Sequence, residues 1–476
     1  MKTKKNFDYD FLKTVWKIAL PIALQSMLQA SFGIVDQIMI GRLGGISVAG
    51  VGLAGKFASL YSVVIAAVGT AAGIMIAQYI GQKNKGDVRR SFFVNLLLAV
   101  GIAFLFTMVC FSVPEIIMGL YTQETDLAMR SAAAEYLSVY AWSFIPAAVM
   151  TLTATLLRCM EKATVPLYAG FISALLNTVL NYVLIFGRFG FAPMGAKGAA
   201  IASVIAQIAG LLIVITLALK DIRELVIGQE ETVYRKILQE EILQEDVLEG
   251  NYAQQAYRSD YFAWWKRYSE ILVPILICEF FWSLGENVYA GIYGHLGTDA
   301  CAAMTLTGPI QSLVIGALCG LSQAAGIIVG KMLGNGEYEE AYKASKKLII
   351  YGFAASILLS LLVFMIRPYY VLIYHVDDTI RGLTMQILIA YAVIAPLKVS
   401  NMILGGGIIR SGGKTGYVMG IDLVGTWLFG VPLGLFAAFI LHLSIPYVYF
   451  ILSLEEGVRL LISLVVFCKK RWMRSL

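Results

Sequence analysis

The sequence predicts an all-α polytopic membrane protein with twelve transmembrane helices in two pseudo-symmetric six-helix bundles. The chain of 476 residues is 59% hydrophobic and only 14% charged, with a mean hydropathy of +0.75. Soluble domains are nearer half apolar and a quarter charged. Twelve apolar stretches are long enough to cross a bilayer, which takes about 20 residues, and the two halves of the chain repeat each other. These observations favour a membrane protein over one large soluble core.

The expected organisation is an N-terminal lobe over residues 1–219, a cytoplasmic linker over 220–267 and a C-terminal lobe over 268–476. The linker is too polar to span a membrane. Six spans are expected in the first lobe, near residues 15–40, 46–80, 92–113, 135–157, 164–187 and 195–219. Six more are expected in the second, near 268–293, 300–333, 345–366, 383–408, 415–440 and 443–467.

The basic residues predict which side of the membrane each loop faces. With the N-terminus placed in the cytoplasm, most Lys and Arg fall in the inner loops, as around Lys83 and Lys343. This bias is typical of cytoplasmic loops, and an even number of spans puts both termini on that side. Trp16 and Trp472 are then expected at the inner interface. We therefore expect a multi-pass protein of the cell membrane.

An internal repeat relates the two lobes. Pro21 and Pro274 are separated by 274 − 21 = 253 residues, and the same offset maps "AAGI" at 71–74 onto "AAGI" at 324–327. Further along, "LLR" ending at Arg158 corresponds to "IIR" ending at Arg410, at an offset of 252. Each lobe has an even number of spans, so both enter the membrane from the same side. Transporters use this arrangement when two bundles rock about a central cavity.

One carboxylate, Asp36, lies in the middle of the first apolar stretch. A charge at the bilayer centre costs at least about 2.5–3.5 kcal/mol, and ionisable residues there are usually functional. The repeat places Tyr289 opposite Asp36, so only the first lobe has this acid. A proton or a hard cation would neutralise it. The alternative is a structural aspartate tied to a neighbouring hydroxyl or amide.

Polar partners for Asp36 are expected on the fifth and sixth spans. Asn177 and Asn181 are four residues apart and so share one helix face. Gly195, Ala199 and Ser203 form a small-residue stripe at the same spacing, which is typical of close helix packing. Ser203 would add a further oxygen. Asp36, Asn177, Asn181 and Ser203 are therefore the candidate residues for proton coupling.

A second polar cluster begins the other lobe. Glu279, Trp282 and Glu286 lie on one face of the seventh span and suit an organic cation, by charge and by cation–π attraction. The alternative is two glutamates bonded to the backbone or to neighbouring helices. Asp422 and Tyr289, also at membrane depth, complete the candidate substrate-binding residues. Glu455 and Arg459, four residues apart in the last span, are expected to neutralise each other.

Enzymatic chemistry has little support in the sequence. It contains no P-loop, GxSxG or HExxH motif, so neither an ATP-driven pump nor a membrane protease is indicated. We expect no enzyme activity and no cofactor apart from a coupling ion. The net charge of +6 is explained by the inner loops and does not point to a nucleic-acid partner.

Three stretches resemble the multidrug and toxic compound extrusion (MATE) antiporters: "PIALQSMLQASFGIVDQIMIGRLGG", "LLNTVLNYVLIFGRFGFAPMGAKGAAIAS" and "GGGIIRSGGKTGYVMGIDLVGTWLFGVPL". The resemblance implies that Asp36 matches the first-helix aspartate of the family's ion site and Asn177 its fifth-helix asparagine. Asn181 stands where many members have a second acid, which favours H⁺ over Na⁺. Ser203 stands where some have threonine, and Ala199 offers a carbonyl nearby. The resemblance thus implies that a Na⁺ site would use Asp36, Asn177, Asn181, Ala199 and Ser203.

The resemblance implies a monomeric secondary antiporter that exports amphipathic or cationic organic compounds in exchange for H⁺ or Na⁺. Two alternatives remain open at this point. A lipid-linked precursor flippase of the same superfamily would have a more basic cavity, whereas here the buried acids outnumber the buried bases. A non-transporting membrane receptor or scaffold would act through the 220–267 linker.

Overall fold

The computed structural model describes residues 2–120, 127–227, 249–374 and 376–476, which form helices and connecting loops with no strand among them. Eleven helices in this part are long and apolar enough to cross a membrane. The N-terminal lobe comprises α1 (Lys2–Gly41), α2 (Gly45–Gly81), α3 (Lys85–Ser112), α4 (Pro114–Gly119), α5 (Leu127–Tyr140), η1 (Ala141–Ser143), α6 (Phe144–Cys159), α7 (Thr164–Phe186) and α8 (Gly195–Ile227).

Residues 228–248 of the predicted linker lie outside the described residues. The two described ends of the linker belong to α8 and to the first helix of the C-terminal lobe. That lobe comprises α10 (Glu249–His295), α11 (Thr298–Gly334), α12 (Tyr338–Leu372), α13 (Asp378–Asn401), η2 (Met402–Ile409), α14 (Gly416–Leu423), η3 (Val424–Gly430), α15 (Val431–Leu435), η4 (Phe436–Ile440), α16 (Ile445–Ser453) and α17 (Glu455–Cys468).

The predicted spans lie where helices are found, with one difference. The stretch predicted at 443–467 consists of two helices, α16 and α17, which meet at Leu454, so neither alone is long enough to span. Glu455 and Glu456 at this junction are both buried and take part in polar contacts rather than facing lipid.

The tenth and eleventh spans contain wide π-helical turns. In η2 the sequence "GGG" at 405–407 allows α11 to approach closely, since a Cβ on Gly407 would meet the backbone oxygen of Ser322 at 2.5 Å. Ser322 Oγ donates to the Met402 oxygen at 2.6 Å and satisfies a carbonyl at the start of this turn. Such π-bulges occur often at functional sites.

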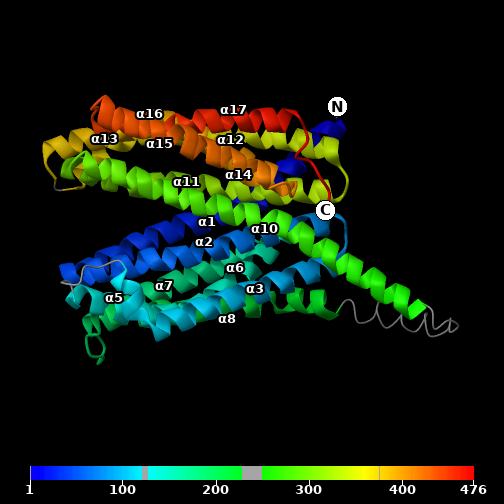
Figure 1. Cartoon of the computed structure of the whole chain (residues 1–476), viewed down its shortest axis with the longest axis horizontal. Coiled ribbons are helices and arrows are strands. Elements are labelled where there is room, and N and C mark those ends of the chain that lie inside the picture. Colours follow the sequence, from blue (N-terminus) through cyan, green and yellow to red (C-terminus); the bar gives the residue numbers. More distant parts are fainter. Residues whose placement is uncertain (1, 121–126, 228–248, 375) are drawn as a thin grey trace.

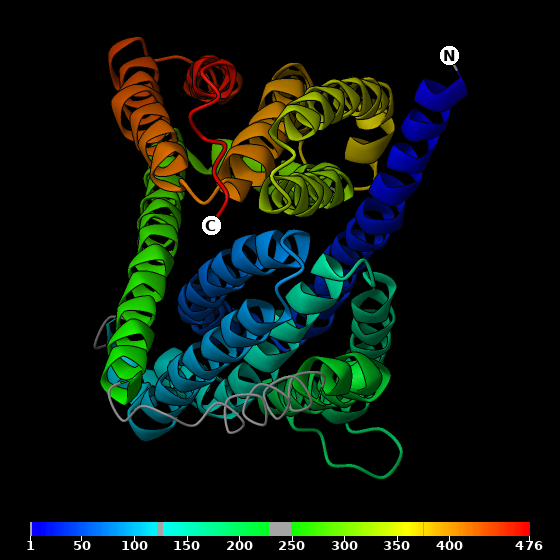
Figure 2. The same ribbon diagram turned by 90° about the vertical axis from the view of Figure 1, so that its right-hand side faces the viewer.

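The lobes lie side by side, and each is crossed by the first helix of the other (Figures 1 and 2). The start of α1 lies beside α12, where the Lys347 ammonium sits 5.7 Å from the Phe11 ring. The start of α10 lies beside α3, where the Tyr268 hydroxyl donates to Asn95 Oδ1 at 2.8 Å. Both chain termini lie at the same end of the molecule (Figure 1); we call this the terminal end.

The helices α2 and α11 cross closely at the terminal end. A Cβ on Gly81 would collide with the Lys331 backbone, and a Cβ on Gly334 would collide with the Gln78 backbone. The repeat relates these contacts to each other, because 81 + 253 = 334 and 78 + 253 = 331. Glycine at both positions therefore lets the two backbones touch, and it brings the lobes together here.

Two further groups join the lobes at this end. Gln78 Nε2 donates to the Ser411 oxygen at 2.6 Å, and its Oε1 accepts from the Leu476 nitrogen at 2.8 Å. The C-terminal tail is thus hydrogen-bonded to α2 of the other lobe. Glu161 binds Lys331 of the other lobe at 2.8 Å and Lys17 at 3.5 Å. Although burial opposes it, bonding to these two ammonium groups holds the pKa of the Glu161 carboxyl below its usual value.

Candidate functional site

The N-terminal lobe contains a cavity of about 470 Å³ that Asp36 lines. Three elements surround it near Asp36: α1 contributes Asp36, α7 contributes Asn177, and α8 contributes Ser203. The Asp36 side chain is half-buried, whereas Asn181, one turn further along α7, is buried with 1% exposed. Asn181 Nδ2 donates to Asp36 Oδ1 at 2.7 Å. The carboxylate is thus held by an amide donor inside the lobe.

The Asn177 amide has two orientations related by rotation about its last bond. In one, its nitrogen donates to Ser203 Oγ and its oxygen accepts from Asn181 Nδ2, each at 3.1 Å. In the other, its nitrogen lies 3.0 and 3.1 Å from the Asp36 oxygens, and its oxygen accepts from Ser203. The second is favoured, because it turns a donor rather than an oxygen toward the carboxylate.

The structure therefore brings Asp36, Asn177, Asn181 and Ser203 into one hydrogen-bonded cluster. Ala199, one turn before Ser203 on α8, is 2% exposed and packs in the core of the lobe. Asn181 Oδ1 is buried and has no hydrogen-bond partner. Sequence reasoning missed Tyr140, which lines the same cavity from the end of α5. Its place is set by the turn at η1, which no spacing in the sequence indicates.

The C-terminal lobe contains a cavity of about 290 Å³ and a smaller one of about 90 Å³. Trp282 lines both, whereas Glu279 lines the larger and Glu286 the smaller. The structure thus places the two glutamates on either side of the indole. Glu279 is paired with Arg410 at 3.2 Å, and the Glu286 side chain is exposed.

The other candidates of this lobe belong to a polar network. Asp422 accepts from Cys278 Sγ at 2.9 Å and lies 3.8 Å from Arg459. Tyr289 donates to Glu455 Oε2 at 2.6 Å. The predicted Glu455–Arg459 pair is confirmed at 3.6 Å. Arginines therefore neutralise much of the acidic charge here, which distinguishes this lobe from the surroundings of Asp36.

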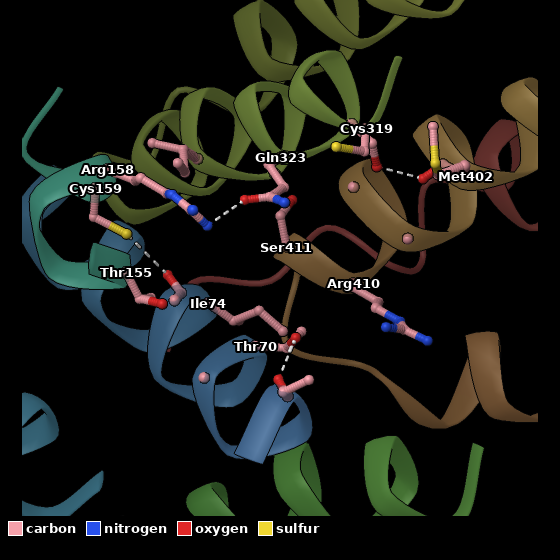
Figure 3. A pocket seen from close by; sticks show the side chains of 18 of the residues that line it. Thr70, Ile74, Thr155, Arg158, Cys159, Cys319, Gln323, Met402, Arg410 and Ser411 are labelled. Carbon is pink, nitrogen blue, oxygen red and sulfur yellow. Dashed lines mark hydrogen bonds between the residues drawn. The ribbon is translucent and has the colours of Figure 1, made fainter. Parts of the chain in front are cut away.

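A third cavity, of about 440 Å³, lies between the lobes and is lined by α2, α6, α11 and η2 (Figure 3). Its charged lining residues are Arg158 from α6 and Arg410 from η2–α14, which the repeat relates to each other. In Figure 3 the Arg158 guanidinium points at Gln323, and that of Arg410 points away from this pair. The sequence predicts an acid excess in the interior, but none of the residues lining this cavity is acidic.

Two repeated helical bundles around cavities, with a carboxylate held inside one of them, are an arrangement typical of membrane transporters. The chain belongs to the MatE family, whose model matches residues 21–183 and again 274–436, at the 253-residue offset of the repeat. Members of this family are transporters and not enzymes. The predicted MATE membership and fold class are thereby confirmed.

Individual proteins are similar to this chain over much of its length. A probable multidrug resistance protein NorM of Bacillus anthracis is 26% identical over 91% of this chain and 90% of its own length. One from Thermotoga maritima is 26% identical over 69% of this chain and 64% of its own. The structure of the Vibrio cholerae MATE transporter VcmN in the bent form matches with a TM-score of 0.80, at 16% identity over 97% of each chain.

Proposed function

We propose that the protein is a multidrug efflux antiporter of the cell membrane, with both termini cytoplasmic, which exports amphipathic or cationic organic compounds as a monomer. Asp36 carries this proposal, because a carboxylate on a half-buried helix face needs a neutralising partner. An ion that enters the N-lobe cavity reaches it there. The names of the relatives from Bacillus anthracis and Thermotoga maritima support the export of drugs.

The groups around Asp36 favour H⁺ over Na⁺ as the coupling ion. The Asn181 amide, and the Asn177 amide in its favoured orientation, turn N–H donors toward the carboxylate. Na⁺ is a hard cation and prefers several oxygen ligands. A protonated Asp36 instead needs an acceptor for its O–H. The buried, unpartnered Asn181 Oδ1 supplies one if that amide rotates.

The place where the lobes meet supports a mechanism of alternating access. The glycine crossing of α2 and α11, the C-terminal tail and Glu161 all join the lobes at the terminal end. With cytoplasmic termini, this is an outward-facing arrangement. Protonation of Asp36 from outside then breaks its charge-assisted bond to Asn181, the packing of α1 against α7 changes, and the cargo is released. Return to the inward-facing state lets the proton leave to the cytoplasm.

The test is efflux of ethidium from proteoliposomes of purified protein, with pH and Na⁺ gradients imposed separately. We expect an inward proton gradient to drive ethidium transport, and a Na⁺ gradient at constant pH to have little effect. Protein-free liposomes and an ionophore that collapses the gradient are the controls. Transport driven only by Na⁺ would reverse the choice of ion. The absence of ethidium flux under either gradient would overturn the antiporter.

A non-transporting receptor or scaffold loses its support, since the chain belongs to a transporter family. The lipid flippase alternative requires a basic cavity. One basic cavity is present between the lobes, but it opens beside an acidic site and is fairly small for a lipid-linked precursor. We therefore retain the antiporter as the conclusion.

A further inference from the structure

Arg158 is an arginine inside the protein without a counter-charge. Its Nη2 donates to Gln25 Oε1 at 2.8 Å and its Nη1 to Gln323 Oε1 at 2.9 Å, and both of these acceptors are neutral amides. Within the described residues no carboxylate lies within 4.0 Å of its nitrogens. Its Nε is buried and has no hydrogen-bond partner. A cationic group inside the protein thus keeps a charge that no neighbouring carboxylate offsets.

Arg410, the arginine that the repeat relates to Arg158, has the acidic partners that Arg158 lacks. Arg410 lies 3.2 Å from Glu279 and 4.0 Å from Asp422, so its charge is compensated. It also contacts Cys278, which the repeat places opposite Gln25 (25 + 253 = 278). The position equivalent to Glu279 is Ser26 (279 − 253 = 26), which has no charge. The N-terminal lobe therefore keeps the arginine but has a serine where the other lobe has its acid.

An uncompensated charge taken out of water is costly unless a partner of opposite sign reaches it. Arg158 lines two cavities, the one between the lobes and the one that contains Asp36. Both have volumes in the range of pockets for small organic molecules. A carboxylate, sulfonate or phosphate is the group that a guanidinium binds best, through paired N–H donors.

We propose that Arg158 binds an anionic group of the transported compound, and that the preferred cargo is a zwitterionic amphiphile. The N-lobe cavity offers a guanidinium from Arg158 and a carboxylate from Asp36, so a molecule with both charges is complementary to its two ends. Nη1 and Nη2 of Arg158 each give one N–H to an amide oxygen, so each keeps a second N–H for the anion. This inference rests on the proposed function and adds a substrate class to it.

The test compares the binding of rhodamine B, which carries a free carboxylate, with that of its ethyl ester, which lacks the anion and keeps the cation. Fluorescence anisotropy is measured with the purified full chain in detergent. We expect the wild type to bind rhodamine B about tenfold more tightly than the ester, as one charge-assisted hydrogen-bond pair would provide. Arg158→Gln should remove this difference by weakening the binding of rhodamine B. Arg158→Lys should restore part of it.

Arg188→Gln is the matched control, because it removes the same charge from an exposed loop residue. Equal affinity of the wild type for the two dyes would overturn the inference even if the Arg158 variants fail to fold. A preference that survives in Arg158→Gln would also overturn it. If neither dye binds, the proposed function fails together with the inference. If both bind equally, only the inference fails.

The anion that binds Arg158 could also come from a second source, the phosphate of a lipid headgroup. Repeating the dye-binding measurement in nanodiscs of phosphatidylcholine and of phosphatidylglycerol distinguishes an anion of the cargo from an anion of the lipid. If the cargo supplies the anion, the preference for rhodamine B persists in both lipids. Loss of the preference in phosphatidylglycerol alone would show that the headgroup occupies Arg158, and would overturn the assignment to cargo.

Discussion

At the scale of single residues, the surroundings of Asp36 and Arg158 decide what the two charges do. Asp36 has amide donors from α7 beside it, so its charge is stabilised without a fixed cation. Arg158 has amide acceptors from α1 and α11, so its charge is also stabilised without a fixed anion. Neutral amides bind both groups, which agrees with the proposed roles of Asp36 and Arg158. Arg410 and Arg459, by contrast, are engaged by carboxylates of their own lobe.

Asn181→Ala tests the role of the amide next to Asp36. It removes the 2.7 Å hydrogen bond to the carboxylate, and a bond to a charged group contributes about 1.5–3 kcal/mol. We expect proton-driven ethidium efflux to fall at least about tenfold, since 1.4 kcal/mol corresponds to a factor of ten. Asn287→Ala is the control, because the exposed Asn287 amide donates only to the Ser283 oxygen of its own helix. Equal loss in both variants would contradict the prediction.

Much of the N-terminal cluster could be predicted from the sequence. Asn177 and Asn181 share a helix face by spacing alone, and the resemblance adds their proximity to Asp36. The position of Arg158 could not be predicted in this way. Its neighbours Gln25 and Gln323 are far apart in the sequence, and only the packing of α1 and α11 brings them to it. Trp472 is fully buried, since the tail folds back onto the lobes, and this burial could not be predicted from the sequence.

At the scale of elements, glycines set how closely the lobes approach. Gly81 and Gly334 allow backbone contact between α2 and α11, and Gly320 allows the same between α11 and α1 near Ala19. The repeat predicts that positions 81 and 334 are equivalent, but not that they face each other. The positions of most helices follow from hydropathy, but α1 and α10 begin well before the predicted apolar stretches, at Lys2 and Glu249. The break at Leu454 does not follow from hydropathy, since "LSLEEGVRLLISL" is apolar enough on average to be read as one span.

Gly81→Ala tests this crossing. A Cβ there would collide with the Lys331 backbone, which cannot move without shifting α11. We expect a loss of stability of about 1–3 kcal/mol, typical of overpacking, and a slower transport cycle, as measured by thermal unfolding and by ethidium efflux. Gly101→Ala in α3 is the control, because nothing lies within 4 Å of the added Cβ. An unchanged unfolding temperature in Gly81→Ala would show that the lobes do not depend on this contact.

At the scale of the whole molecule, the two lobes share one fold but differ in how their buried charges are compensated. The first lobe holds a lone carboxylate and an uncompensated arginine, whereas the second neutralises its charges internally. Between them lies a cavity that both repeat-related arginines line. The sequence shows this asymmetry in part, since Asp36 corresponds to Tyr289. The charge balance of the central cavity depends on which side chains turn inward, which only the structure provides.

The central claim is that Asp36 couples ion movement to the export of cargo through the whole molecule. The most direct measurement is proton-driven ethidium efflux by Asp36→Asn in proteoliposomes, at matched protein content. Asp378→Asn is the control, since Asp378 is an exposed residue that pairs with Arg381 at 3.0 Å. We predict that Asp36→Asn loses gradient-driven efflux by at least about 100-fold, equivalent to about 2.8 kcal/mol, while it still binds ethidium and Asp378→Asn transports normally. Proton-driven efflux at the wild-type rate in Asp36→Asn would contradict the account.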